Sequence, residues 1–220
     1  MSDSRKRKPI HKDANSRKKP KGYYKRQSNT TTPVGLKPGI SGIFVSCPKD
    51  RERLCVRECY NLFNETNPPV DPTNFVHYIL SDLYDNKLKK SRFIQRLTPI
   101  TKACYADMPE IIVLAKEVIG AHFHSQDEIT KEEKKNIHYS IVPRIRNNKM
   151  IDRTQLIDTL AGIVGKQHTV NLDNPELAVL VEVFKNVCGI SVVRDYLKFK
   201  KFNLELIPST DDNLNAESTQ

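Results

Sequence analysis

The chain has 220 residues, and its 36 Lys and Arg residues exceed its 26 Asp and Glu residues to give a formal net charge of +10. This length fits one domain, or one domain with a small subdomain and tails. The five cysteines are odd in number and show no paired spacing, and the chain carries no secretory signal or long apolar run. We therefore expect an intracellular protein with reduced thiols, not a disulfide scaffold or a membrane protein.

The basic excess is confined to residues 1–38, which hold twelve Lys or Arg residues and only two acids. Residues 39–220 hold 24 of each sign and have no net charge. A segment so rich in charge and so poor in apolar residues cannot repay the entropy of ordering. The sequence therefore predicts disorder for residues 1–38, and likewise for the polar, acidic residues 208–220.

Two basic clusters stand eight residues apart within the first tail, from Lys8 to Arg17. This spacing is typical of a bipartite nuclear-localisation signal, made of Arg5, Lys6, Arg7, Lys8, Arg17, Lys18 and Lys19. A sequence-independent contact to RNA phosphates and a merely solubilising arm remain alternative roles.

Residues 39–46 predict a short buried strand, and Cys47-Pro48 opens a predicted helix that runs to Asn64. A linker over 64–72 leads to a second predicted helix over 72–87. The apolar residues that share one stripe on these two helices are Cys55, Cys59, Leu62 and Phe63 on the first and Phe75, Ile79 and Leu83 on the second.

Residues 92–106 alternate and include β-branched and aromatic side chains, which predicts a strand with an edge or a bulge at Pro99. Asp107 then caps a predicted helix over 108–123. One side of this helix carries Ile111, Ala115, Val118 and His122. A charged loop is expected over 125–136.

Residues 137–146 form the clearest predicted strand, because apolar and polar positions alternate without a break. One face carries Ile137, Tyr139, Ile141 and Ile145, and the other carries His138, Arg144 and Arg146. Asp152 and Gln155 give the signature of a capping box for a helix that ends at Gly165. Three further strands are predicted over 168–172, 177–184 and 189–195. The order predicts an α/β or α+β domain with a mixed sheet of five to seven strands.

The sequence holds no phosphate-binding loop, dinucleotide fingerprint, nucleophile elbow or zinc-protease pair. Cys55 and Cys59 have a spacing that suits two zinc thiolates, but a second ligand pair with zinc-ribbon spacing does not follow. Cys104 has no neighbouring feature that would activate a nucleophile. We therefore expect no catalytic residue, no cofactor and no metal.

Basic residues on strand-period segments are more informative. They are Arg92, Arg96 and Lys102 in one segment, and Arg144, Arg146, Asn147, Asn148 and Lys149 in another. The planar fork of a guanidinium binds two phosphate oxygens at once, and a turn that feeds a helix adds free backbone N–H groups. An RNA-binding face and an ordinary solvated sheet face paired with Asp and Glu are equally consistent with this pattern.

Five segments stand in series along the chain, namely RFIQRLTP (92–99), VPRIRNN (142–148), IDRTQLIDTLAGIVG (151–165), VNLDNPELAVLVEVFKNVCGISVV (170–193) and KKFNLELI (200–207). Together they closely resemble the eukaryotic THUMP-domain tRNA acetyltransferase adaptors. The resemblance implies a ferredoxin-like N-terminal subdomain over 39–90 and a THUMP RNA-binding domain over 91–207. Pro99, Gly162, Gly165 and Gly189 also match, and their implied role is structural.

The same resemblance implies a non-catalytic adaptor that grips the acceptor end of tRNA and works with a separate acetyltransferase that uses acetyl-CoA and ATP. The implied product is N4-acetylcytidine in the D-arm of leucine and serine tRNAs, in the nucleus and its nucleolus. The RNA contacts carried over from the matching segments are Arg92, Gln95, Arg96, Arg144, Arg146, Asn147 and Lys185. A general RNA-binding or ribosome-assembly factor and a small RNA-modifying enzyme remain the alternatives.

Overall fold

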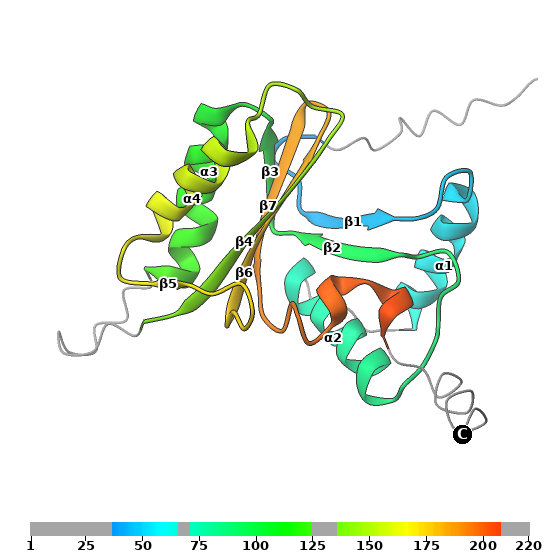
Figure 1. The fold of residues 1–220 in the computed structure, drawn as a ribbon. Helices are drawn as coiled ribbons and strands as arrows, with labels where there is room; N and C mark the ends of the chain where they lie inside the picture. Colours follow the sequence, from blue (N-terminus) through cyan, green and yellow to red (C-terminus); the bar gives the residue numbers. More distant parts are fainter. Residues whose placement is uncertain (1–36, 66–70, 125–135, 208–220) are drawn as a thin grey trace, which may run out of the picture. The chain divides into compact units, whose positions relative to one another are not determined.

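Two β-sheets carry the part of the chain that the computed structural model describes, residues 37–65, 71–124 and 136–207 (Figure 1). The smaller sheet pairs β1 (Gly42–Ser46) antiparallel with β2 (Arg96–Ile100). The larger sheet has the strand order β3-β7-β6-β4-β5. Its strands are β3 (Lys102–Tyr105), β4 (His138–Arg146), β5 (Thr169–Val170), β6 (Leu177–Phe184) and β7 (Val187–Val193). The larger sheet is mixed, as predicted, because β4 runs parallel to β5 and β6 whereas the other pairs are antiparallel.

Helices α3 (Met108–Phe123) and α4 (Arg153–Val164) cover one face of the larger sheet (Figure 1). Ile111 and Leu156 of these helices are fully buried there against Val179 and Ile190 of the sheet. The four apolar residues predicted for one face of the β4 strand, Ile137, Tyr139, Ile141 and Ile145, all pack into this same core. The predicted alternation is therefore confirmed, and it directs Arg144 and Arg146 to the opposite face of the sheet.

The opposite face forms a second core with helices α1 (Glu52–Asn64) and α2 (Pro72–Asp85) and with β2. Leu180 and Ala178 of the larger sheet meet Ile79 of α2 and Leu97 of β2 in this core. Strands β6 and β7 are thus covered on both faces, which explains their nearly continuous apolar sequences. Two short 3-10 turns, Lys200–Phe202 and Leu204–Leu206, complete the second core.

Local signals explain where α4 begins and ends. Asp152 accepts a hydrogen bond from the backbone N–H of Gln155 at 2.8 Å, so the predicted cap of α4 is confirmed. Asp107 occupies the corresponding position of α3 as predicted, but its side chain makes no capping hydrogen bond. Helix α4 ends at Gly165 with a φ of +95°, a conformation that favours glycine.

The predicted strand over 92–106 is in fact two strands that belong to different sheets. The chain leaves β1's partner β2 at Ile100 and enters β3 at Lys102. Pro99 lies in the two-stranded sheet, where both strands are edges, so the predicted edge position is confirmed. Periodicity reports only that a segment is extended, and it does not identify the strand with which the segment pairs.

Other predicted details were also wrong. The first helix begins at Glu52, because Asp50 takes a left-handed φ of +63° after Pro48. Strand β1 is half-buried along its whole length, and it pairs with only one strand, β2. The predicted strand over 168–172 shrinks to the two exposed residues of β5.

The N-terminal part has the order β1–α1–α2–β2 around a two-stranded sheet. This differs from the βαββαβ order that a ferredoxin-like subdomain would have. The division at residues 90 and 91 stays a prediction, and the β1–β2 pairing crosses it. The predicted basic tail up to residue 36, most of the linker over 64–72, the charged loop up to residue 135 and the acidic tail lie outside the described residues. None of the described helices is long and apolar enough to cross a membrane.

Candidate nucleic-acid interface

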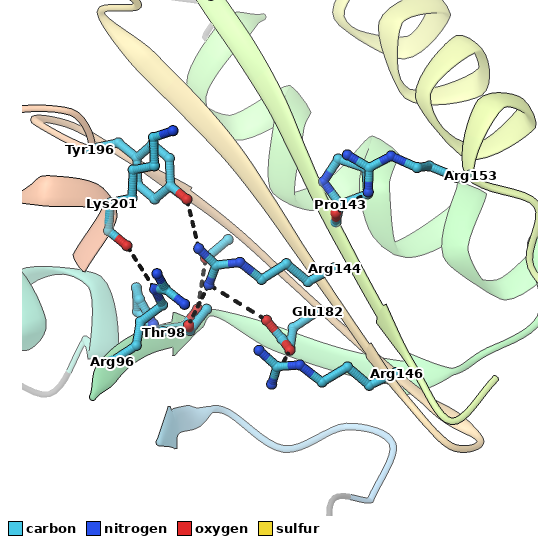
Figure 2. A network of polar contacts seen from close by, with 11 residues as sticks. Arg96, Thr98, Pro143, Arg144, Arg146, Arg153, Glu182, Tyr196 and Lys201 are labelled. Atoms are coloured by element: carbon cyan, nitrogen blue, oxygen red, sulfur yellow. Dashed lines mark hydrogen bonds and ion pairs between the residues drawn. The ribbon is translucent and has the colours of Figure 1, made fainter. Parts of the chain in front are cut away.

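Arg144 and Arg146 of β4 meet the carboxylate of Glu182 on the neighbouring strand β6 (Figure 2). Arg144 is the register partner of Glu182, and its Nη1 lies 3.9 Å from Glu182 Oε2. Arg146 comes closer, with 2.9 Å between its Nη1 and Glu182 Oε1. The carboxylate is buried, with 4% of the residue exposed, so the acidic partner of the two arginines lies inside the fold.

A third arginine, Arg96, reaches the same region from β2 (Figure 2). Its Nε donates a hydrogen bond to the carbonyl oxygen of Lys201 at 3.0 Å. Arg144 contacts β2 and the segment that follows β7. Its Nη2 donates to the Tyr196 hydroxyl at 2.8 Å, and its Nη1 donates to Thr98 Oγ1 of β2 at 3.4 Å. Arg96, Arg144 and Arg146, with Glu182 beside them, are called the arginine cluster below.

The charges of the arginine cluster do not balance, since three guanidinium groups share one carboxylate. Burial raises the pKa of Glu182 even though Arg146, Arg144 and Arg96 all act to lower it. Burial and the positive charge of Arg144 lower the pKa of Arg96. An added anion would relieve this repulsion, and a phosphate suits it because guanidinium forks bind phosphate oxygens two at a time.

The guanidinium groups are held by the fold but remain open to solvent. The side chain of Arg144 is 18% exposed and that of Arg146 is 37% exposed. Arg146 also lies over the ring of Phe44 in β1, with its Cζ 5.5 Å from the ring centroid. Contacts on several sides reduce the rotamer entropy that binding a ligand would otherwise cost.

A group of exposed predicted residues lies at the ends of β4 and β6. Asn147 and Lys185 both have left-handed φ values, +54° in each case, and the backbone N–H of Lys185 donates to the carbonyl of Arg146 at 3.0 Å. Asn148 ties the two turns together, because its Nδ2 donates to the carbonyl of Lys185 at 2.7 Å. Asn147, Lys149 and Lys185 are exposed and adjoin the Arg146 end of the arginine cluster.

Three other predicted contact residues have different surroundings. Lys102 of β3 forms an ion pair with Glu117 of α3 at 2.7 Å. Arg92 is exposed and its backbone N–H donates to the carboxylate of Glu58 in α1 at 3.1 Å. Gln95 is half-buried and uses its backbone to bond Ser46 and Leu204. The structure thus unites Arg96, Arg144 and Arg146, whereas Lys102 pairs with Glu117 and Arg92 contacts Glu58 through its backbone N–H. The residues of the predicted nuclear-localisation signal lie outside the described chain.

Glu182 and Tyr196 belong to this site but were not predicted from the sequence. Glu182 had a usable signal, because it is the one charged residue in the apolar strand LAVLVEVF, and a buried carboxylate requires a partner. Tyr196 had none, since its contact with Arg144 joins residues 52 positions apart. Arg144 and Arg146 do pair with an acid, as the structural alternative expected, but the acid is buried and the pairing leaves positive charge in excess.

The cysteines belong to the cores of the protein. Burial raises the pKa of the Cys55 thiol, and the neighbouring Cys59 and Cys47 raise it further. Cys104 and Cys188 face each other across β3 and β7, and their hydrogen bond together with burial raises the pKa of Cys188. Within the described ranges, no group of three or more His, Cys, Asp or Glu residues is arranged to hold a metal ion.

The sequence of this chain is similar to those of known THUMP-domain proteins. Residues 105–193 match the THUMP domain. THUMP domain-containing protein 1 of Mus musculus is 29% identical over an alignment of 255 residues, which covers 86% of this chain and 70% of that protein. The tRNA acetyltransferase TAN1 of Saccharomyces cerevisiae is 39% identical over 157 residues, 67% of this chain and 53% of that protein.

Among solved structures, the THUMP domain of THUMP domain-containing protein 1 matches with 31% identity and a TM-score of 0.32, and covers 40% of this chain and 84% of that one. The residues that match the THUMP domain include Arg144, Arg146 and Glu182. Arg96 and Tyr196 lie outside the matched range, on the two sides of it.

Proposed function

Because the chain belongs to the family of THUMP-domain proteins that includes THUMP domain-containing protein 1 and TAN1, we propose that it binds tRNA and presents it to a separate acetyltransferase. The observation that carries the RNA-binding part of this proposal is the arginine cluster, in which three guanidinium groups share one buried carboxylate. The proposal makes the excess positive charge a binding site for RNA phosphates.

The arginine cluster suits recognition of the RNA backbone and not of a particular base sequence. A-form RNA has a deep, narrow major groove, so proteins read its backbone, its 2′-hydroxyls and its single-stranded ends. Arg144 and Arg146 project from neighbouring positions of one strand face, and exposed Asn147, Lys149 and Lys185 continue the surface beyond them. Such a surface binds phosphates by charge and shape, without a requirement for base sequence.

The proposal assigns catalysis to the partner, which uses acetyl-CoA and ATP, and makes this chain a non-catalytic adaptor. The product is N4-acetylcytidine in the D-arm of leucine and serine tRNAs. TAN1 supports the link to acetylation through its own description as a tRNA acetyltransferase.

We also propose that the protein acts in the nucleus, and within it in the nucleolus. The support is the pair of basic clusters at residues 5–8 and 17–19. A fluorescent fusion of the whole chain is expected to concentrate there. Replacing both clusters by Ala should disperse it, whereas unchanged localisation would contradict the signal.

Nucleoside mass spectrometry on tRNA and ribosomal RNA from cells without this protein tests the proposal in vivo. We expect N4-acetylcytidine to be lost from leucine and serine tRNAs while its level in ribosomal RNA is unchanged. If the level in tRNA stayed normal, the acetyltransferase link would fail and a general RNA-binding role would be favoured.

Reconstitution separates adaptor from catalyst. The acetyltransferase with acetyl-CoA, ATP and tRNA should form acetylcytidine efficiently only when this chain is added. This chain alone should form none, and product from it alone would make it an enzyme. The double substitution R144Q/R146Q should weaken tRNA binding, whereas K116Q/K166Q removes two exposed charges from α3 and from the turn after α4 and should have little effect.

A further inference from the structure

The residues that follow β7 cross over to the N-terminal sheet and form what we call the C-terminal strap, residues 196–207. The backbone N–H of Leu204 donates to the carbonyl of Gln95 at 2.9 Å, and Asn203 forms an isolated bridge with Arg96. Phe199 and Phe202 anchor the strap in the second core with 0% and 1% of their surfaces exposed. The strap is therefore an integral part of the fold.

Three consecutive residues of the strap have left-handed backbone conformations. The φ values of Lys200, Lys201 and Phe202 are +52°, +58° and +60°. Residues other than Gly, Asn and Asp adopt this region rarely, and usually singly. The folded protein holds the turn through the two buried phenylalanines and through the hydrogen bond from Arg96 Nε to the Lys201 carbonyl.

The left-handed turn separates buried from exposed side chains. It buries Phe199 and Phe202 on one side while Lys200 and Lys201 between them are exposed. Within the described part of the chain, no carboxylate pairs with either ammonium group. A strained conformation that the surrounding structure enforces is a recognised mark of functional positions.

The left-handed turn that carries Lys200 and Lys201, called the lysine turn below, contacts the arginine cluster. Lys201 accepts the hydrogen bond of Arg96 through its carbonyl, and Tyr196, at the start of the strap, accepts the hydrogen bond of Arg144 (Figure 2). The backbone of the turn that carries Lys200 and Lys201 is therefore hydrogen-bonded to the arginine cluster, and both lysine side chains of this turn are exposed. This turn lies beyond residues 105–193, which match the THUMP domain.

We propose that Lys200 and Lys201 bind phosphates of the same RNA that the arginine cluster holds, so that the strap provides a second RNA contact outside the THUMP match. The inference rests on the proposed tRNA-binding function. RNA is favoured over an acidic protein segment because the lysine turn is hydrogen-bonded to Arg96 of the arginine cluster, and an RNA backbone that binds the cluster presents further phosphates at regular spacing.

The test uses the whole chain with the substitutions K200N/K201N. Asn tolerates left-handed φ values, so this variant removes two charges without disturbing the turn. The matched control is K116N/K166N, which removes two exposed charges at a distance from the strap. Fluorescence anisotropy measures the affinity for labelled tRNA at several salt concentrations, and circular dichroism verifies that both variants are folded.

We expect K200N/K201N to weaken tRNA binding roughly fivefold to tenfold at moderate salt, and to reduce the slope of log K against log salt by about two. The variant K200R/K201R should bind as the unchanged protein does. The control should retain its affinity, and an equal loss in the control would attribute the effect to net charge and overturn the proposal.

The two proposals fail separately. If K200N/K201N leaves tRNA affinity unchanged while R144Q/R146Q lowers it, the lysine turn has no RNA contact and the proposed function stands. If neither pair of substitutions affects tRNA binding, the proposed function fails as well. If K200N/K201N binds tRNA normally but binds the acetyltransferase less tightly, the turn recognises an acidic protein surface and the RNA contact is refuted.

Discussion

Arg144 and Glu182 are register partners on neighbouring parallel strands, yet the carboxylate of Glu182 lies closer to Arg146, at 2.9 Å, than to Arg144, at 3.9 Å. The offset frees the guanidinium of Arg144 to bond Tyr196 and Thr98. Arg144 therefore connects the larger sheet with β2 and with the C-terminal strap. The buried acid and the connecting arginine have separate roles, and substitutions should distinguish them.

The substitution R144K should lower both stability and tRNA affinity. A lysine keeps the charge but has a single ammonium group, which cannot reproduce the fork that bonds Tyr196 and Thr98. We expect a loss of about 1–2 kcal/mol in the free energy of unfolding, from one or two hydrogen bonds, and a several-fold weaker affinity for tRNA. Urea denaturation and tRNA titration measure the two effects.

The matched control for R144K is R153K. Arg153 of α4 donates from Nη1 to the carbonyl of Pro143 at 2.6 Å and takes no part in the arginine cluster. R153K should lose comparable stability without a change in tRNA affinity. Equal tRNA affinities for the two variants would show that the fork of Arg144 does not contribute to binding.

The buried carboxylate of Glu182 should make stability depend on pH in a definite direction. Its folded-state pKa is raised above the ordinary 4.5, mainly by burial, so the folded state binds a proton more tightly than the unfolded state does. The contribution of Glu182 to stability is thus complete below about pH 4.5 and is lost as pH rises through the raised pKa.

Comparison of the unchanged protein with E182Q isolates this effect, because Gln has similar size and no charge. The unfolding free energy of the unchanged protein minus that of E182Q should fall between pH 4 and pH 7, by about 1.4 kcal/mol for each unit by which the pKa is raised. Urea denaturation at several pH values gives this difference. A difference that grew with pH would mean that the arginines outweigh burial.

A side chain at Gly189 of β7 should destabilise the protein. A Cβ at this position would lie 2.7 Å from both Cδ1 and Cγ2 of Ile100, so β2 packs directly onto the glycine. We expect G189A to cost about 1–3 kcal/mol of stability through overpacking. The control is G162A in α4, where a Cβ meets nothing within 4 Å and where Ala should stabilise the helix by about 0.5–1 kcal/mol.

A double substitution tests the cause of the G189A effect. Replacing Ile100 by Ala removes the atoms that clash, so the combined variant G189A/I100A should be more stable than the sum of the single effects predicts. A coupling free energy of about 0.5–3 kcal/mol is expected from thermal or urea denaturation. Strict additivity would mean that the contact between β2 and β7 is not what excludes a side chain.

The N-cap residues of α3 and α4 are both Asp, but they should contribute different amounts to the free energy of unfolding. D152A removes a hydrogen bond of 2.8 Å to the backbone N–H of Gln155 and should cost about 1 kcal/mol. D107A removes a side chain that makes no capping hydrogen bond and should cost less. Urea denaturation of both variants provides the comparison, and equal losses would contradict the assignment of the caps.

Most helices and strands of this protein could be predicted from patterns in its amino-acid sequence. Residues 137–146 alternate clearly, so the two faces of β4 followed from a period of two, and the apolar runs over 177–184 and 189–195 predicted the strands β6 and β7. The cap at Asp152 and the end of α4 at Gly165 could also be predicted from neighbouring residues. These features depend on residues within a few positions of one another, and such interactions are visible in a linear pattern.

The contacts between charged residues could not be predicted from the sequence, because they depend on the fold. Arg96, Arg144 and Tyr196 come from three separate segments, and Lys102, which the pattern grouped with Arg96, faces Glu117 instead. The change of sheet between β2 and β3 separates those two residues, and no periodicity encodes it. Contacts of this kind depend on how the cores bring distant segments together, because burial and pairing across the fold, and not local preference, set the distance between two charges.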